Sequence, residues 1–161
     1  MDSLSNTTSF ATLTGTYPAT KLASGLSINT DTLICTGDSH ASIVMDVLFR
    51  SKETVTRNFD IIICATGSNS TVENNRVQIQ LPASAGNNGS VSLASLAGLA
   101  PLLFDLDLAG NRAIILESGV SIYVRNLAAL TADIYVTVKK EVSKNDLRNY
   151  ISNPYFYVQE V

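Results

Sequence analysis

The stretch DIYVTV, residues 133–138, is the strongest strand pattern in the chain and decides the fold class. Isoleucine and valine alternate in it with tyrosine and threonine, and this period of two places successive side chains on opposite faces of a sheet. A second such stretch, Val120–Arg125, precedes it across the loop Asn126–Thr131. We expect the two strands to pair as antiparallel neighbours across that loop.

Short apolar and β-branched runs separated by turn residues fill the chain from Lys21 onward, at the spacing typical of a two-sheet sandwich. In one of them, period two places Ile43, Met45, Val47 and Phe49 on one face. The sequence therefore predicts an all-β fold, an antiparallel β-sandwich of jelly-roll or immunoglobulin-like type. The strands expected before residue 120 are Leu22–Ile28, Thr32–Cys35, Ala41–Arg50, Val55–Ala65, Val77–Leu81, Leu102–Leu108 and Arg112–Leu116.

One segment has helical spacing instead. Leu93, Leu96, Ala97 and Ala100 recur at intervals of three and four, which is typical of one face of an α-helix. Pro101 stops the pattern, because proline has no backbone N–H to continue a helix. We expect a single short helix of two to three turns.

A chain of 161 residues can bury one hydrophobic core but not a second large domain. We expect three parts: an N-terminal arm at 1–19, rich in Ser, Thr and Gly, a β-sandwich domain at 20–142, and a C-terminal docking tail at 143–161. Four of the eleven Phe and Tyr residues lie in the last twelve positions, which favours docking on a neighbouring surface. The candidate partner-docking residues are Phe10, Tyr17, Tyr150, Tyr155, Phe156 and Tyr157.

The charge pattern disfavours nucleic acid as a partner. The net charge is −3, and the eleven Lys and Arg residues are scattered, with Lys139 and Lys140 as their one adjacent pair. Phosphate binding needs clustered positive charge, so we expect no nucleic-acid binding. No stretch reaches the roughly 18 apolar residues of a membrane span, and the first residues lack the pattern of a secretory signal. We therefore expect no membrane association.

Two groups of residues contain side chains of the kinds that serve in catalysis or in metal binding. Asp38-Ser39-His40 holds the residue types of a hydrolase triad, but adjacent residues in a turn point apart and no G-x-S-x-G motif is present. His40 is then a loop histidine. Asp105 and Asp107 would lie on one side of a strand, where a hard-cation site is the alternative to a simple acidic strand edge or turn cap.

The two cysteines, Cys35 and Cys64, each lie within an apolar run, which favours small buried hydrophobic side chains. A disulfide between them is the alternative. Together with the single histidine they supply at most three zinc ligands, so we expect no zinc site. The sequence therefore predicts no catalytic, cofactor-binding or metal-binding residues, and we expect a protein that is not an enzyme.

The final third contains a recognisable series of motifs. A small-residue helical stretch at residues 92–99 is followed by a D-x-x-G-N-R turn at Asp107–Arg112. An L-x-x-G-x-x-I-x-V hairpin then lies at Leu116–Val124, and a closing T-A-x-I-x-V-x-V strand at Thr131–Val138. This pattern, over Ser90–Val138, resembles small virion structural proteins of tailed bacteriophages. The resemblance implies a capsid auxiliary or head decoration protein, whose sandwich sits on the particle surface while terminal arms lie across capsid subunits.

The same resemblance implies the partners and the location. The partners would be the major capsid protein or other virion proteins, with a homo-oligomer as the assembled form, in a virion put together in the host cytoplasm. The alternative is a receptor-binding or carbohydrate-binding sandwich module of a tail or baseplate. Sugar-binding sites commonly present flat aromatic rings, and the absence of tryptophan disfavours that alternative.

Overall fold

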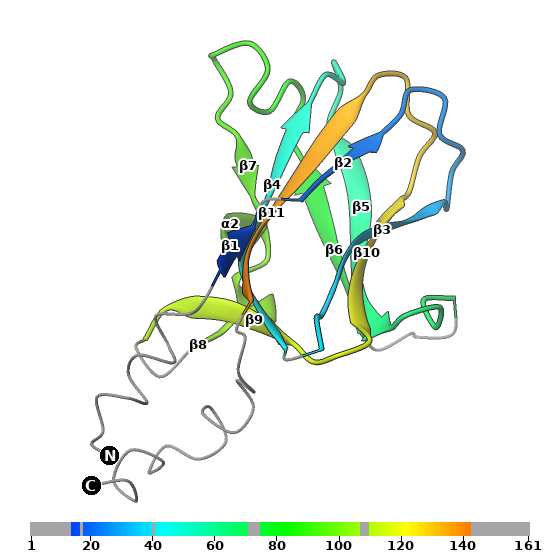
Figure 1. The fold of residues 1–161 in the computed structure, drawn as a ribbon. Coiled ribbons are helices and arrows are strands. Elements are labelled where there is room, and N and C mark those ends of the chain that lie inside the picture. Colours follow the sequence, from blue (N-terminus) through cyan, green and yellow to red (C-terminus); the bar gives the residue numbers. More distant parts are fainter. Residues whose placement is uncertain (1–13, 17, 40, 71–74, 107–109, 143–161) are drawn as a thin grey trace, which may run out of the picture.

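The computed structural model describes residues 14–16, 18–39, 41–70, 75–106 and 110–142. They form two antiparallel β-sheets packed face to face, with one short α-helix (Figure 1). The prediction of an all-β antiparallel sandwich with one short helix is confirmed. The division into arm, sandwich and tail stays a prediction.

Seven strands form the large sheet and four form the small one. The large sheet contains, in spatial order, β1 (Thr14–Thr16), β11 (Ile134–Val142), β4 (Ser42–Ser51), β9 (Arg112–Leu116) and β8 (Asp105–Leu106); β2 (Ala19–Leu22) also pairs with β11, and β7 (Ala94–Ser95) with β4. The small sheet contains β3 (Asp31–Thr36), β10 (Val120–Asn126), β5 (Arg57–Ala65) and β6 (Arg76–Leu81). The helical elements are α2 (Leu96–Leu99) and the 3-10 turn η1 (Pro101–Leu103).

The core lies between the two sheets, where the inward side chains of both meet. Phe49 of β4 and Phe59 of β5 are fully buried in it, and burial of each ring contributes roughly 1.5–3 kcal/mol. Strand β6 follows the predicted alternation, because Ile79 is buried while Gln78 and Gln80 are exposed. A strand with one face on the core and one in solvent is thus correctly predicted by period two alone.

The predicted pairing of the strand Val120–Arg125 with the strand at residues 133–138 is wrong. Strand β10 pairs with β3 and β5 in the small sheet, whereas β11 pairs with β4 in the large sheet. The loop at 127–133 crosses from one sheet to the other, a distance of about 10 Å. Both strands therefore lie between neighbours from elsewhere in the chain, and each contributes its apolar face to the core from its own side.

The predicted faces of β4 are correct at one end and wrong at the other. The register of β4 against β11 shifts at Met45, which is the extra residue of a β-bulge and is 46% exposed. The bulge moves the alternation by one residue. Val44, Val47 and Phe49 therefore lie in the main core, while Ile43 belongs to a separate small cluster.

The helix is shorter than predicted. It is the single turn α2, and Ala94–Ser95, expected as its first turn, instead pair as β7 with β4. The Ser95 hydroxyl caps the helix by accepting from the Gly98 N–H, and it donates to the Asp46 carboxylate at 2.6 Å. This bond fixes where the extended chain stops and the helix begins.

Two predicted strands are also corrected. The strand expected at Leu22–Ile28 does not form: β2 shares only Leu22 with this range, because the chain turns at Gly25, where φ is +87°. The strand expected at Leu102–Leu108 is reduced, within the described residues, to β8, because Pro101 starts a 3-10 turn over the preceding residues.

Ion pairs join loops and strands that are distant in sequence. Arg125 of β10 donates from Nη2 to Asp31 Oδ2 of β3 at 2.7 Å, and both side chains are only 15% exposed. Lys140 of β11 donates to Asp38 Oδ2 at 2.9 Å, which holds the β3–β4 connection against the large sheet. These acidic groups are therefore bound by cations of the same chain.

Acid is expected to destabilise the fold. Arg125 holds the pKa of Asp31, and Lys140 the pKa of Asp38, below the usual 3.8. Burial raises the pKa of Glu53, but hydrogen bonds to its carboxylate outweigh this effect and leave the pKa below the usual 4.5. A carboxyl with a lowered folded-state pKa adds stability that is complete above its unfolded pKa and is lost as pH falls through the folded value.

The urea midpoint should therefore be level from about pH 7 down to about pH 5 and fall steadily below about pH 4.5. Asp31→Asn should be less stable at pH 7 and show a shallower fall in acid. A profile that stays level down to pH 3 would contradict this assignment of the carboxyl groups.

Candidate docking surfaces

The candidate docking residues Phe10, Tyr17, Tyr150, Tyr155, Phe156 and Tyr157 lie outside the described residues. The points where their segments join the sandwich are described. Thr14, the first residue of β1, pairs with Val142, the last residue of β11. The chain therefore enters and leaves the sandwich at neighbouring positions, at one end of the large sheet.

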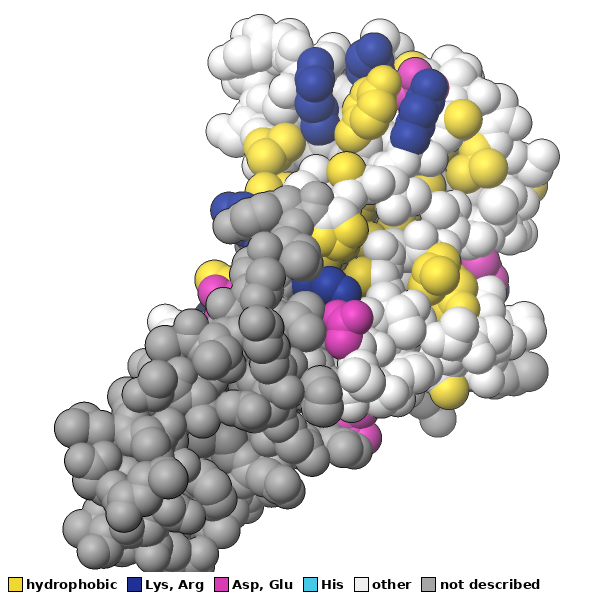
Figure 2. Space-filling view, viewed as in Figure 1, with side chains coloured by type: hydrophobic (Ala, Val, Ile, Leu, Met, Phe, Trp, Pro, Cys, Tyr) yellow, Lys and Arg dark blue, Asp and Glu magenta, His cyan; other side chains and the backbone are white. Residues whose placement is uncertain are grey.

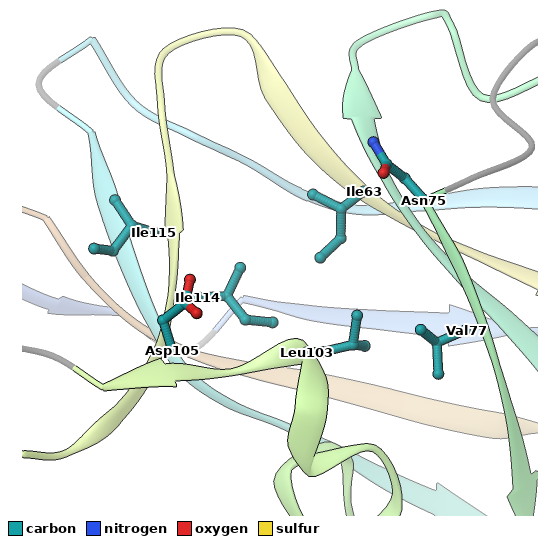
Figure 3. Close-up of a pocket in the computed structure, with 7 residues that line it drawn as sticks. All are labelled: Ile63, Asn75, Val77, Leu103, Asp105, Ile114 and Ile115. Carbon is teal, nitrogen blue, oxygen red and sulfur yellow. The ribbon is translucent and has the colours of Figure 1, made fainter.

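A pocket of about 340 Å³ opens near this same end of the sandwich. Val142 pairs with Ser42, which pairs with Leu116, so β9 at the pocket is two strand spacings from the end of β11. Neighbouring strands lie about 4.8 Å apart, which makes that distance about 10 Å. Side chains from both sheets face the pocket (Figure 3). The lining residues are Ile63, Asn75, Val77, Leu103, Asp105, Ile114 and Ile115.

Most residues that line the pocket are aliphatic, and exposed leucines lie next to them in sequence. Five of the seven lining residues are aliphatic, and Asp105 and Asn75 are the two polar ones. Leu102 is 99% exposed and Leu106 is 71% exposed, next in sequence to lining residues of the pocket. Large, exposed apolar side chains on the segment that lines a pocket favour a surface that binds another protein.

The carboxylates singled out in the sequence have separate environments. Asp105 lies on β8 at the pocket, while Asp107 lies outside the described residues. Asp38 accepts from Lys140 and from the Ser42 hydroxyl, and His40 is outside the described residues. Within the ranges described above, no group of three or more His, Cys, Asp or Glu side chains gathers in a way that could hold a metal ion.

The cysteines are free and buried, as the favoured interpretation predicted, and the disulfide alternative is wrong. Cys35 lies in the main core, whereas Cys64 lies in a separate cluster with Ile62 and Tyr123. Burial raises the pKa of the Cys35 thiol to about 11, so it stays protonated at neutral pH. A protonated, buried thiol is a poor nucleophile and a poor metal ligand.

A patch of cations on the outer face of the large sheet was not predicted. Lys21, Arg50 and Lys52 gather around the ring of Tyr135, with Asp133 beside them; we call this group the Tyr135 patch. The Lys52 Nζ lies 5.5 Å and the Arg50 Cζ 5.9 Å from the ring centroid. Figure 2 shows basic side chains grouped with hydrophobic ones on this face. The prediction that the chain has no clustered basic residues is therefore wrong at this one place.

No protein-family model matches the chain, and no curated protein matches it. Among solved structures, the chain is similar to a chain of the cyanophage Pam1 capsid asymmetric unit. The TM-score is 0.41 and the identity 15%, over 81% of this chain and 84% of that chain. At this distance the likeness carries no argument about function. No helix in the described part of the chain is long and apolar enough to cross a bilayer.

Proposed function

We propose that this chain is a non-enzymatic structural component of a tailed-phage virion, a capsid auxiliary or decoration protein. The observation that carries the proposal is the pairing of Thr14 with Val142. It gives both terminal segments one point of departure, near a pocket lined mostly by aliphatic residues, with the exposed Leu102 and Leu106 next to lining residues in sequence. The motif pattern over residues 90–138, which resembles phage virion proteins, supports the same assignment.

This arrangement suits a protein that is attached to a particle at one end. Segments that order on binding lose conformational entropy, so each single contact is weak. Many symmetric copies, each with two segments leaving the same end, raise the effective concentration of every further contact. The partners are then the major capsid protein or other virion proteins, with the chain as a homo-oligomer in a virion that assembles in the host cytoplasm.

The hydrogen-bonded and ion-paired acids of the sandwich fit a structural role better than a catalytic one. Glu53 is fully buried, and donors of the same chain occupy its carboxylate. Asp31 and Asp38 are each paired with a cation. Acids held in this way stay ionised and exchange no proton near neutral pH, which supports the proposal that the chain is not an enzyme.

Deleting Tyr155–Val161 is expected to lower incorporation into particles at least tenfold while leaving the sandwich folded. All the strand pairs of the described residues lie within 14–142, so the unfolding free energy should change by less than about 0.5 kcal/mol. Incorporation is measured by quantitative mass spectrometry of purified particles, and stability by urea unfolding.

A matched control changes Ser152 and Asn153 to alanine, which keeps the aromatic residues, and it should be incorporated normally. Normal incorporation of the truncated chain would remove the role of the tail. Particles that contain no copy of the full chain would overturn the proposed function itself.

A further inference from the structure

We infer that the Tyr135 patch is a docking site for an extended, carboxylate-rich segment of a partner protein. The inference rests on described residues alone and does not depend on the virion assignment. The patch lies on the outer face of the large sheet, on strands β2, β4 and β11 and the residues beside them. It is a different surface from the pocket and from the end where the terminal segments leave.

The sheet register places the patch side chains in rows. Tyr135 pairs with Lys21 on one side and with Arg50 on the other, so these three side chains lie side by side across three strands. The next row is formed by Lys52 and Asp133, since the Lys52 N–H donates to the Asp133 carbonyl at 3.0 Å. Three cations thus share one small area of sheet that is set by backbone pairing.

The acid inside the patch is already occupied. The Lys21 Nζ lies 3.0 Å from Asp133 Oδ2, and the Ser24 N–H donates to Asp133 Oδ1 at 2.9 Å. Arg50 and Lys52 are exposed, and both side chains lie over the Tyr135 ring. The charge of Lys52 also acts on Asp133, the carboxylate that Lys21 already binds. Three cations against one carboxylate leave the patch with an excess of two positive charges.

Three cations outside the patch are ion-paired. Arg57, Arg125 and Lys140 each hold a carboxylate of this chain. The chain as a whole carries a net charge of −3, so the charge of this area is opposite in sign to the net charge of the protein. Like charges held together on a rigid sheet repel one another, and an added carboxylate relieves that repulsion.

The spacing of the cations fits an extended acidic peptide. Arg50 and Lys52 are two residues apart on one face, which is about 7 Å along a strand. Acidic residues at alternate positions of an extended peptide have the same spacing. The guanidinium of Arg50 can bind a carboxylate through two hydrogen bonds.

The test measures binding of the full chain to a fluorescein-labelled peptide with alternating glutamate and glycine, by fluorescence anisotropy at 50 mM salt. We expect saturable binding that weakens at least tenfold when Arg50 and Lys52 are both changed to glutamate. Binding should also weaken at 200 mM salt. A peptide with glutamine in place of glutamate should not bind.

Arg112→Glu is the matched control, because Arg112 is an exposed cation on β9 away from the patch. It should bind the peptide within twofold of the unaltered chain. Circular dichroism should show that each variant is folded, because the changed positions are exposed. The inference is overturned if Arg50→Glu/Lys52→Glu binds normally, if Arg112→Glu loses as much affinity, or if oligothymidine binds more tightly than the glutamate peptide.

Discussion

Replacing Glu53 by alanine is expected to lower the free energy of unfolding by about 3–5 kcal/mol. The Glu53 side chain is fully buried and accepts hydrogen bonds at 2.6–3.0 Å. The donors are Nη2 of Arg57, the N–H and hydroxyl of Thr131, and the N–H of Ala132. The alanine variant leaves the partly buried guanidinium without its carboxylate and the other donors without an acceptor, and such orphaned groups are costly.

The position of Glu53 explains why its loss is expected to lower the free energy of unfolding so strongly. It lies in the connection between β4 and β5, whereas Thr131 and Ala132 lie in the loop that crosses from the small sheet to the large one. One carboxylate therefore holds the crossover loop at 127–133 against the β4–β5 connection, which also joins the two sheets. Losing it should loosen the loop as well as weaken the fold.

Urea unfolding measures the effect, with Glu117→Ala as the control. Glu117 is exposed in the β9–β10 turn, so its removal should change stability by less than about 0.5 kcal/mol. A double change of Glu53 and Arg57 to methionine should be less destabilising than the alanine variant, because it removes both charges together. A loss below about 1 kcal/mol in the alanine variant would show that the carboxylate does not link the β4–β5 connection to the crossover loop.

Strand positions were predictable from the sequence where one face is apolar and the other polar. Glutamines alternate with aliphatic residues at 77–81, and β6 has the predicted faces. The partners of a strand were not predictable in this way, because period two specifies which face is buried and not which strand lies beside it. Val120–Arg125 and residues 133–138 were therefore paired wrongly, although each was correctly identified as a strand.

Local irregularities depend on contacts that no short window of sequence contains. The bulge at Met45 follows from how β4 matches β11, almost a hundred residues later. The start of α2 depends on the bond between Ser95 and Asp46, which are 49 residues apart. Helical spacing alone therefore predicted more turns than form.

The two candidate docking surfaces also differ in how far the sequence predicts them. The aromatic residues of the terminal segments could be identified by composition, and they stay a prediction. The Tyr135 patch could not, because Lys21, Arg50 and Tyr135 are far apart in sequence and only the register of three strands brings them into a row. Scattered cations in a sequence do not exclude a basic patch on a sheet.

Replacing Gly37 by alanine is expected to destabilise the protein by about 3 kcal/mol. Gly37 is buried between β3 and β4, and its N–H donates to the Val120 carbonyl at 2.8 Å. A Cβ at this position would lie 2.7 Å from the Leu116 carbonyl oxygen and closer still to that of Glu117. Both are backbone atoms of the β9–β10 turn, so no side-chain rotation can relieve the contact.

Gly98→Ala is the matched control. A Cβ at Gly98 would meet nothing within 4 Å, and the residue lies in α2, where alanine is the better helix former. This variant should be as stable as the unaltered chain or more stable by up to about 1 kcal/mol. The β9–β10 turn joins the large sheet to the small one, so a Gly37 variant that moves it must separate the sheets at that end. Equal urea midpoints for the two variants would show that the turn can shift freely and that this end of the sandwich is not closely packed.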